Sequence, residues 1–160
     1  LVIFTPKAPL RMKESRSHVD EFTSGSFQEV LDDPRVTDKN AVKRIVLCSG
    51  KVAHDAMSER DKRNAAVAVV RVEQLYPFPI DQINEVISRY PNAKEIVWLQ
   101  EEPENMGPWH FVEHLIWRVK ERGFDLRHVA RVPSGSPATG SKAIHDQELA
   151  DLMDETFAGF

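Results

Sequence analysis

The chain has 160 residues, a length that predicts one domain with a sizeable core. Hydrophobic residues make up 41% and charged residues 29%, and the formal net charge is −4, which argues against a broad nucleic-acid-binding surface. No apolar run approaches the roughly 18 to 20 residues that span a bilayer, so we expect neither a nucleic-acid partner nor a membrane partner.

The first 40 residues are predicted to be an interdomain segment with an entry strand. The run LVIF (1–4) is apolar and strand-like, and a polar stretch follows to about residue 40, in which a short helix fits residues 26–31. The chain starts inside the strand-like run and without Met. We therefore interpret it as a part cut from a longer polypeptide.

Residues 41–160 are predicted to form one α/β domain, because apolar runs alternate with helical patterns. In chain order we expect a strand at 43–50, a helix at 51–64, a strand at 65–72, a helix at 80–90, a strand at 95–100, a helix at 109–122, a strand at 126–132 and a helix at 142–157. This alternation predicts right-handed crossovers and a mostly parallel sheet that is covered on both faces.

Three polar, glycine-containing segments follow predicted strands, at 49–51, 100–107 and 134–141. Ligands of such folds bind beyond the carboxyl ends of the strands, where helix amino ends favour anions. Ser49-Gly50-Lys51 lacks the spacing of a Walker A loop but could offer N–H groups, a hydroxyl and an ammonium to a phosphate. The residues alone favour the simpler interpretation, a strand-to-helix turn with Ser49 as its cap.

Two further motifs could carry chemistry. His110, Glu113 and His114 match H-x-x-E-H, which predicts a zinc hydrolase, but no third ligand can be named and the same helix carries a packing stripe. Cys48, the single cysteine, lies in an apolar run and is expected to be a small buried hydrophobe. We therefore predict no metal site and no catalytic residue in either motif.

The acidic stretch QEEPENMGPW (100–109) follows a predicted buried strand. Its glutamates could act as a general acid/base pair if their environments separated their pKa values. The alternative, which we favour for Glu102 and Glu104, is that they complement the positive end of the next helix. For Glu101, which is nearest the strand end, both interpretations stay open. Trp109 is expected to pack back onto the sheet.

Several segments together resemble the carboxy-terminal end of the thiamine-diphosphate-dependent component of 2-oxoglutarate dehydrogenase, within the transketolase superfamily. They are FTPK (4–7) with Leu10-Arg11, VLCSGK (46–51), VRVEQLYPFP (70–79), WLQEEPENMGPW (98–109) and RVPSGSPATG (131–140). The resemblance implies a three-layer α/β/α domain like the transketolase C-terminal domain. It also marks Glu101, Glu102, Asn105, Gly107 and Trp109 as a structural signature, with Glu101 and Glu102 fixing the turn or an interdomain contact.

The resemblance implies a homodimeric enzyme of the tricarboxylic acid cycle. That enzyme decarboxylates 2-oxoglutarate with thiamine diphosphate and Mg²⁺ and passes the succinyl group to the lipoyl arm of a succinyltransferase, alongside a dihydrolipoyl dehydrogenase. The family's cofactor-binding and catalytic motifs lie in earlier domains and do not occur in this chain. We therefore expect the chain alone to be inactive and to serve assembly and regulation, in bacterial cytoplasm or, alternatively, in the mitochondrial matrix.

Actinobacterial members of this family bind acetyl-CoA as an activator on this domain. Carried over by motif, the expected contacts are Arg11, Ser49, Lys51 and Gln100. This chain departs from the common pattern at Met106-Gly107-Pro108 and around Arg131, where many members have a second basic residue. Three alternatives stay open: an independent nucleotide- or anion-binding module, a 2-oxoadipate dehydrogenase homologue, and the zinc hydrolase.

Overall fold

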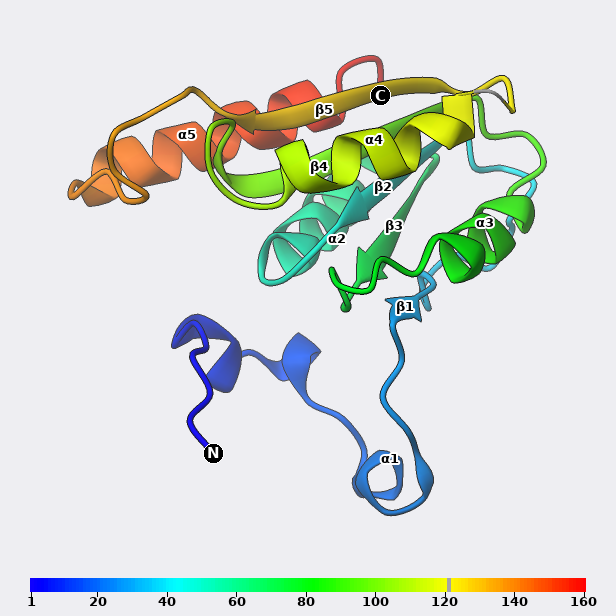
Figure 1. Cartoon of the computed structure of the whole chain (residues 1–160), viewed down its shortest axis with the longest axis horizontal. Helices are drawn as coiled ribbons and strands as arrows, with labels where there is room; N and C mark the ends of the chain where they lie inside the picture. The colour runs from blue at the N-terminus through cyan, green and yellow to red at the C-terminus, as the bar shows by residue number, and fades with distance from the viewer. Residues whose placement is uncertain (121) are drawn as a thin grey trace.

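A five-stranded sheet forms the body of the computed structural model, which describes residues 1–120 and 122–160 (Figure 1). The strand order is β1-β3-β2-β4-β5, and every neighbouring pair is parallel except β1 with β3. The strands are β1 (Val30–Leu31), β2 (Arg44–Cys48), β3 (Val67–Val72), β4 (Glu95–Pro103) and β5 (Asp125–Arg131). The predicted mostly parallel sheet is confirmed.

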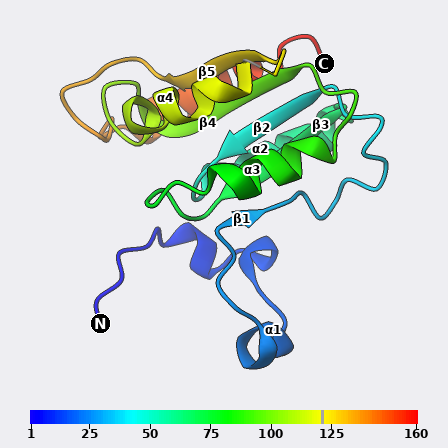
Figure 2. The same ribbon diagram turned by 45° about the vertical axis from the view of Figure 1, so that its right-hand side comes forward.

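Helices cover both faces of this sheet, so the predicted three-layer α/β/α fold is also confirmed. Helices α3 (Ile80–Ser88) and α4 (Trp109–Lys120) pack on one face, and α2 (Val52–Arg63) and α5 (Lys142–Thr156) pack on the other (Figure 2). The predicted continuation of the third helix through residue 121 lies outside the described residues. Within the described parts of the chain, no helix is long and apolar enough to cross a membrane.

The strands are continuous apolar runs because both sides of each strand are buried. Successive side chains point to opposite faces of a sheet. Accordingly, Ile45 and Leu47 join the core beneath α3 and α4, whereas Val46 and Cys48 join the core beneath α2 and α5. All four side chains are fully buried. An apolar run without alternation therefore led to the correct strand prediction here.

The chain reverses its direction across the sheet between β2 and β4. From β2 it moves to β3 on one side, and from β4 it moves to β5 on the other side. β2 and β4 are parallel neighbours, with Cys48 opposite Leu99 at their carboxyl ends. Ligands of open α/β sheets bind at such a switch point. The loops after β2 and β4 therefore define the position at which a ligand crevice is expected.

Residues 1–29 form an arm that lies outside this body (Figure 1). The arm contains two short 3₁₀ turns, η1 (Ala8–Leu10) and η2 (Lys13–Ser15), and one helix, α1 (Val19–Ser24). The strand predicted at residues 1–4 is wrong, because that run has no neighbouring strand to pair with and stays exposed. The helix predicted at 26–31 is also wrong: Val30 and Leu31 are drawn into the sheet by pairing with β3.

Two aspartates fix the segment that joins the arm to the body. The buried Asp33 carboxylate accepts hydrogen bonds from the Arg60 guanidinium and, at 2.8 Å, from the Val69 backbone N–H. The neighbouring Asp32 accepts hydrogen bonds from the Tyr90 hydroxyl and, at 2.5 Å, from Lys39 Nζ. Burial opposes ionisation of Asp32, but these donors outweigh it and hold its pKa below the usual value. The arm therefore leaves the body from a fixed point.

Candidate functional site

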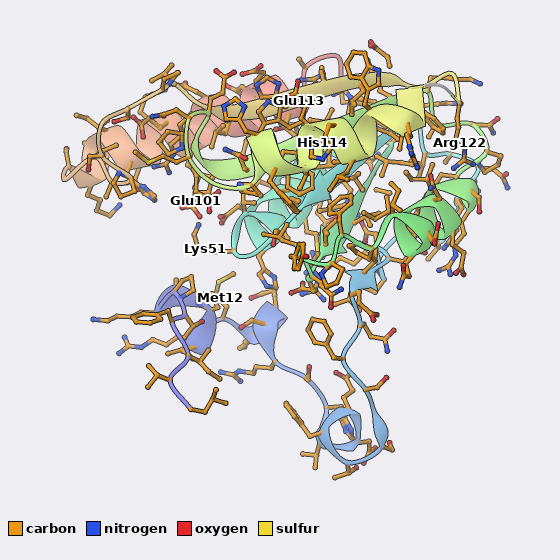
Figure 3. All side chains as sticks on the ribbon, viewed as in Figure 1. Met12, Lys51, Glu101, Glu113, His114 and Arg122 are labelled. Atoms are coloured by element: carbon orange, nitrogen blue, oxygen red, sulfur yellow. The ribbon has the colours of Figure 1, made fainter. Side chains whose placement is uncertain are left out.

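The carboxyl ends of β2, β4 and β5 bring together a cluster of charged side chains. Lys51 Nζ lies 2.6 Å from Asp55 Oδ2 and 3.4 Å from Glu101 Oε1, and Arg131 Nη2 lies 3.7 Å from the same Glu101 oxygen. Figure 3 shows Lys51 and Glu101 beside each other at this edge of the molecule. Glu101 thus lies between two cations, which explains why a carboxylate is tolerated at the end of a buried strand.

The turn that places Lys51 depends on Gly50. Gly50 has φ 76°, a left-handed conformation that glycine adopts without strain. Lys51 follows it as the residue that caps the amino end of α2, with Ser49 half-buried before the turn. The predicted polar strand-to-helix turn at 49–51 is confirmed, but Ser49 as its cap is wrong. Lys51 occupies the cap position, and no side chain caps the helix by a hydrogen bond.

Lys51 carries a stable positive charge. Burial lowers the pKa of Lys51. The hydrogen bond to Asp55 and the nearby Glu101 carboxylate together raise this pKa by more than burial lowers it, so the net shift is upward. The ammonium therefore stays protonated across the physiological pH range. An anion that enters this crevice meets a cation whose present partners are both carboxylates, so it must compete with them for the ammonium.

Arg131 connects this cluster to α5. Its side chain is buried, Nη1 lies 3.3 Å from Glu148 Oε2, and Nη2 lies 3.1 Å from His145 Nδ1. Because a guanidinium can only donate, Nδ1 of His145 must accept this hydrogen bond. His145 and Glu148 are three residues apart and so share one face of α5. That spacing was a usable sequence signal, but sequence analysis did not select either residue.

Gln100 organises the loop that follows β4. Its side chain is only 2% exposed, and Oε1 accepts a hydrogen bond of 2.9 Å from the backbone N–H of Trp109, the first residue of α4. Its Nε2 donates to the carbonyl oxygens of Met106 at 2.8 Å and Pro103 at 3.0 Å. One side-chain amide therefore joins both ends of the loop by hydrogen bonds to backbone groups.

The predicted acetyl-CoA contacts lie in different settings. Ser49 and Lys51 are together at the switch point, whereas the amide of Gln100 points into the loop that it organises. Arg11 is exposed on the arm. A role of Arg11, Ser49, Lys51 and Gln100 in binding acetyl-CoA stays a prediction.

The other signature residues have identifiable contacts. Asn105 exchanges two hydrogen bonds of 2.9 Å with the backbone of Ser134 and so ties the β4 loop to the β5 loop. Gly107 has φ 67°, and a Cβ there would come within 3.0 Å of Glu102 Cβ. Glycine is therefore required both for its conformation and for the close approach of Glu102.

Trp109 anchors the start of α4. Its side chain is buried, and its ring stacks on the His128 imidazole of β5 with centroids 4.2 Å apart. The predicted packing of Trp109 onto the sheet is therefore confirmed. Glu104 lies near the same imidazole, with 3.4 Å between Glu104 Oε1 and His128 Nε2.

Glu101 and Glu102 face different partners. They are successive residues of β4, and their side chains therefore point to opposite sides of the sheet. Glu101 faces Lys51 and Arg131, and Glu102 packs over Gly107. This separation argues against an acid/base pair made of these two residues. The interpretation that Glu102 and Glu104 complement the amino end of α4 stays a prediction.

The zinc motif lies on α4, apart from Lys51 and Glu101 (Figure 3). His110 and His114 are exposed, and His114 makes an edge contact with Phe111. Among residues 1–120 and 122–160, no group of three or more His, Cys, Asp or Glu side chains is arranged to hold a metal ion. The short motif therefore corresponds to a packing helix with a polar outer face.

Cys48 is also a packing residue. It is fully buried, and burial raises the pKa of its thiol to about 12, so almost none of it is ionised at neutral pH. The thiolate is the nucleophilic form of cysteine. Cys48 is therefore the small buried hydrophobe that the sequence predicted.

Fold and crevice together define a class: an α/β domain with a charged cluster at its topological switch point. The family model described as 2-oxoglutarate dehydrogenase C-terminal matches residues 16–157. The chain belongs to this family, as its motifs had suggested.

The names of individual relatives agree with the family assignment. The chain is 42% identical over 159 residues to the 2-oxoglutarate dehydrogenase E1 component of Cupriavidus necator, covering 99% of this chain and 17% of that protein. It is 40% identical over 162 residues to the E1 component of an Exiguobacterium species, with the same coverage. It is 39% identical over 159 residues to the E1/E2 component of Corynebacterium glutamicum, covering 98% of this chain and 13% of that protein. The chain thus spans less than a fifth of the length of these relatives.

Replacing Gln100 by Leu should destabilise the chain by about 1–3 kcal/mol, because it leaves the buried Trp109 N–H without its acceptor. The free energy of unfolding from urea titration measures this. Gln147→Leu is the matched control, because Gln147 is exposed and its side-chain amide donates to Asp151 within α5. If Gln100→Leu were as stable as Gln147→Leu, Gln100 would not organise the loop.

Proposed function

We propose that this chain is the C-terminal assembly and regulatory domain of a 2-oxoglutarate dehydrogenase E1 component. The observation that carries the proposal is the family match over residues 16–157, together with relatives near 40% identity over almost the whole chain. The complete polypeptide would decarboxylate 2-oxoglutarate oxidatively in the tricarboxylic acid cycle. It would pass the succinyl group to the lipoyl arm of a succinyltransferase.

Thiamine diphosphate and Mg²⁺ belong, in this proposal, to the rest of the polypeptide. A Mg²⁺–diphosphate site requires converging oxygen ligands. The carboxylates of the crevice, Asp55 and Glu101, are paired with Lys51, and no cluster of metal-binding side chains is found among the described residues. The residues of this chain therefore do not fit the cofactor, and we assign it no step of the decarboxylation.

The proposed partners follow from the same membership. They are the remainder of the same polypeptide, a second E1 subunit in a homodimer, and the succinyltransferase and dihydrolipoyl dehydrogenase components. The matched relatives named above are bacterial, which supports a bacterial cytoplasmic enzyme over a mitochondrial one. A 2-oxoadipate substrate is the alternative within this proposal, because substrate choice would be made outside this domain.

Regulation by acetyl-CoA would use the switch-point crevice. The amino end of α2, where the helix dipole favours negative charge, and the Lys51 ammonium are suited to a CoA phosphate. Ser49 would add a hydroxyl from the same turn, and Arg11 a cation from the arm. Gln100 would act indirectly in this scheme, by holding the loop that carries Glu101.

The complete polypeptide is expected to release CO₂ from 2-oxoglutarate in the presence of thiamine diphosphate and Mg²⁺, and the 160-residue chain alone is expected to release none. Measuring CO₂ release in both preparations checks this. A preference for 2-oxoadipate would support the alternative substrate. Decarboxylation by the 160-residue chain alone would contradict the proposal that the active site lies in the rest of the polypeptide.

Calorimetric titration of acetyl-CoA into the complete enzyme should show binding that weakens by about tenfold or more in Lys51→Met, because a charge-assisted contact to phosphate is lost. Lys142→Met is the control: Lys142 is an exposed lysine of α5 that pairs with Asp146 of the same helix. Absence of binding at millimolar acetyl-CoA in the unmodified enzyme would end the regulatory proposal.

A further inference from the structure

The arm, residues 1–29, exposes an unusual amount of apolar surface. Eight of its large hydrophobic side chains are between 65% and 114% exposed: Leu1, Val2, Ile3, Phe4, Leu10, Val19, Phe22 and Phe27. None of the residues in η1, η2 and α1 is buried. Soluble monomers rarely expose this much contiguous apolar surface unless it contacts another molecule or segment.

Helix α1 also lacks the means to be stable alone. It has six residues, and no side chain caps its amino end. Isolated helices shorter than about 12–15 residues are marginal in water, so short helices depend on packing of an apolar face. Phe22, 78% exposed, is the large apolar side chain in the middle of α1. The surface that would stabilise α1 is therefore external to the described chain.

A hollow of about 880 Å³ separates the arm from the edge of the sheet. Phe22, Phe27 and Leu31 supply apolar parts of its lining, and Arg71 and Glu73 supply charged parts. Arg71 Nε is buried and has no hydrogen-bond partner among the described residues, although Arg71 Nη1 lies 3.6 Å from Glu73. The lining suits an apolar protein segment that presents a carbonyl or carboxylate oxygen to Arg71.

The charges of α1 favour a protein surface over a membrane as the partner of Phe22. Asp20 and Glu21 come directly before Phe22, so insertion of this side chain would bring two carboxylates to the membrane. Anionic headgroups would repel them. By contrast, acidic and basic residues at the rim of a protein interface are ordinary.

We propose that the arm docks onto the remainder of the E1 polypeptide and that an apolar segment from that remainder fills the hollow beside Arg71. This rests on the proposed function. The relatives place at least four-fifths of their length outside the matched region, which is a sufficient source for such a surface. Asp32 and Asp33 fix the root of the arm, so docking orients the whole α/β body against the remainder.

Hydrogen exchange of the backbone amides of residues 19–28 tests the proposal, in the complete polypeptide and in the 160-residue chain. Docking predicts exchange at least about tenfold slower in the complete polypeptide, because docked segments open less often. The double variant Phe22→Ser/Phe27→Ser should abolish this difference. Ile144→Ser is the control: Ile144 is 52% exposed on α5, away from the arm (Figure 1).

Equal exchange in the complete polypeptide and the 160-residue chain would overturn docking. Protection that disappears on dilution to monomer would point to a second copy instead, and protection that appears only on adding anionic vesicles would point to a membrane; either result overturns the proposal. CO₂ release by the same complete polypeptide is measured in parallel. If the unmodified complete polypeptide decarboxylates normally but residues 19–28 show no added protection in it, the docking alone is refuted. Absence of decarboxylation refutes the proposed function.

Discussion

The hydrogen bonds of one buried amide, that of Gln100, determine the geometry of the crevice. The loop after β4 must leave a buried strand, turn, and start α4 without leaving backbone groups unpaired inside the protein. Gln100 meets this requirement by accepting from the Trp109 N–H and donating to Met106 and Pro103. The adjacent residue, Glu101, is thereby directed toward Lys51 and Arg131.

The charged cluster depends on the loop after β4, which follows Glu101, and on α5, whose His145 and Glu148 contact Arg131. Glu101 contributes from β4, Lys51 and Asp55 from α2 and the turn before it, and Arg131 from β5. The cluster thus joins three neighbouring strand ends across the point where the strand order reverses. Each charge in it has a partner of opposite sign, and a bound anion would compete with these ion pairs for Lys51.

The sequence predicted the body of the domain well because strands buried on both faces leave uninterrupted apolar runs, as at 43–50 and 95–100. It failed for residues 1–4, because an apolar run becomes a strand only when a neighbouring strand supplies its hydrogen bonds. The hydrogen bonds of Gln100 were beyond reach, because they depend on the folded loop after β4. The spacing of His145 and Glu148 placed both on one helix face, but their pairing with Arg131 depends on how α5 packs beside β5. Family resemblance identified the signature residues, and the contacts explain them.

The central claim, that Gln100 fixes the loop, is tested most directly by native-state hydrogen exchange at the Trp109 backbone N–H. An N–H in the first turn of a helix has no partner within that helix and usually exchanges fast. If Gln100 accepts this hydrogen bond in a buried site, the Trp109 amide should exchange at least about a hundredfold more slowly than an unprotected amide, and this protection should be lost in Gln100→Ala. Fast exchange of the Trp109 amide in the unmodified chain would contradict the account.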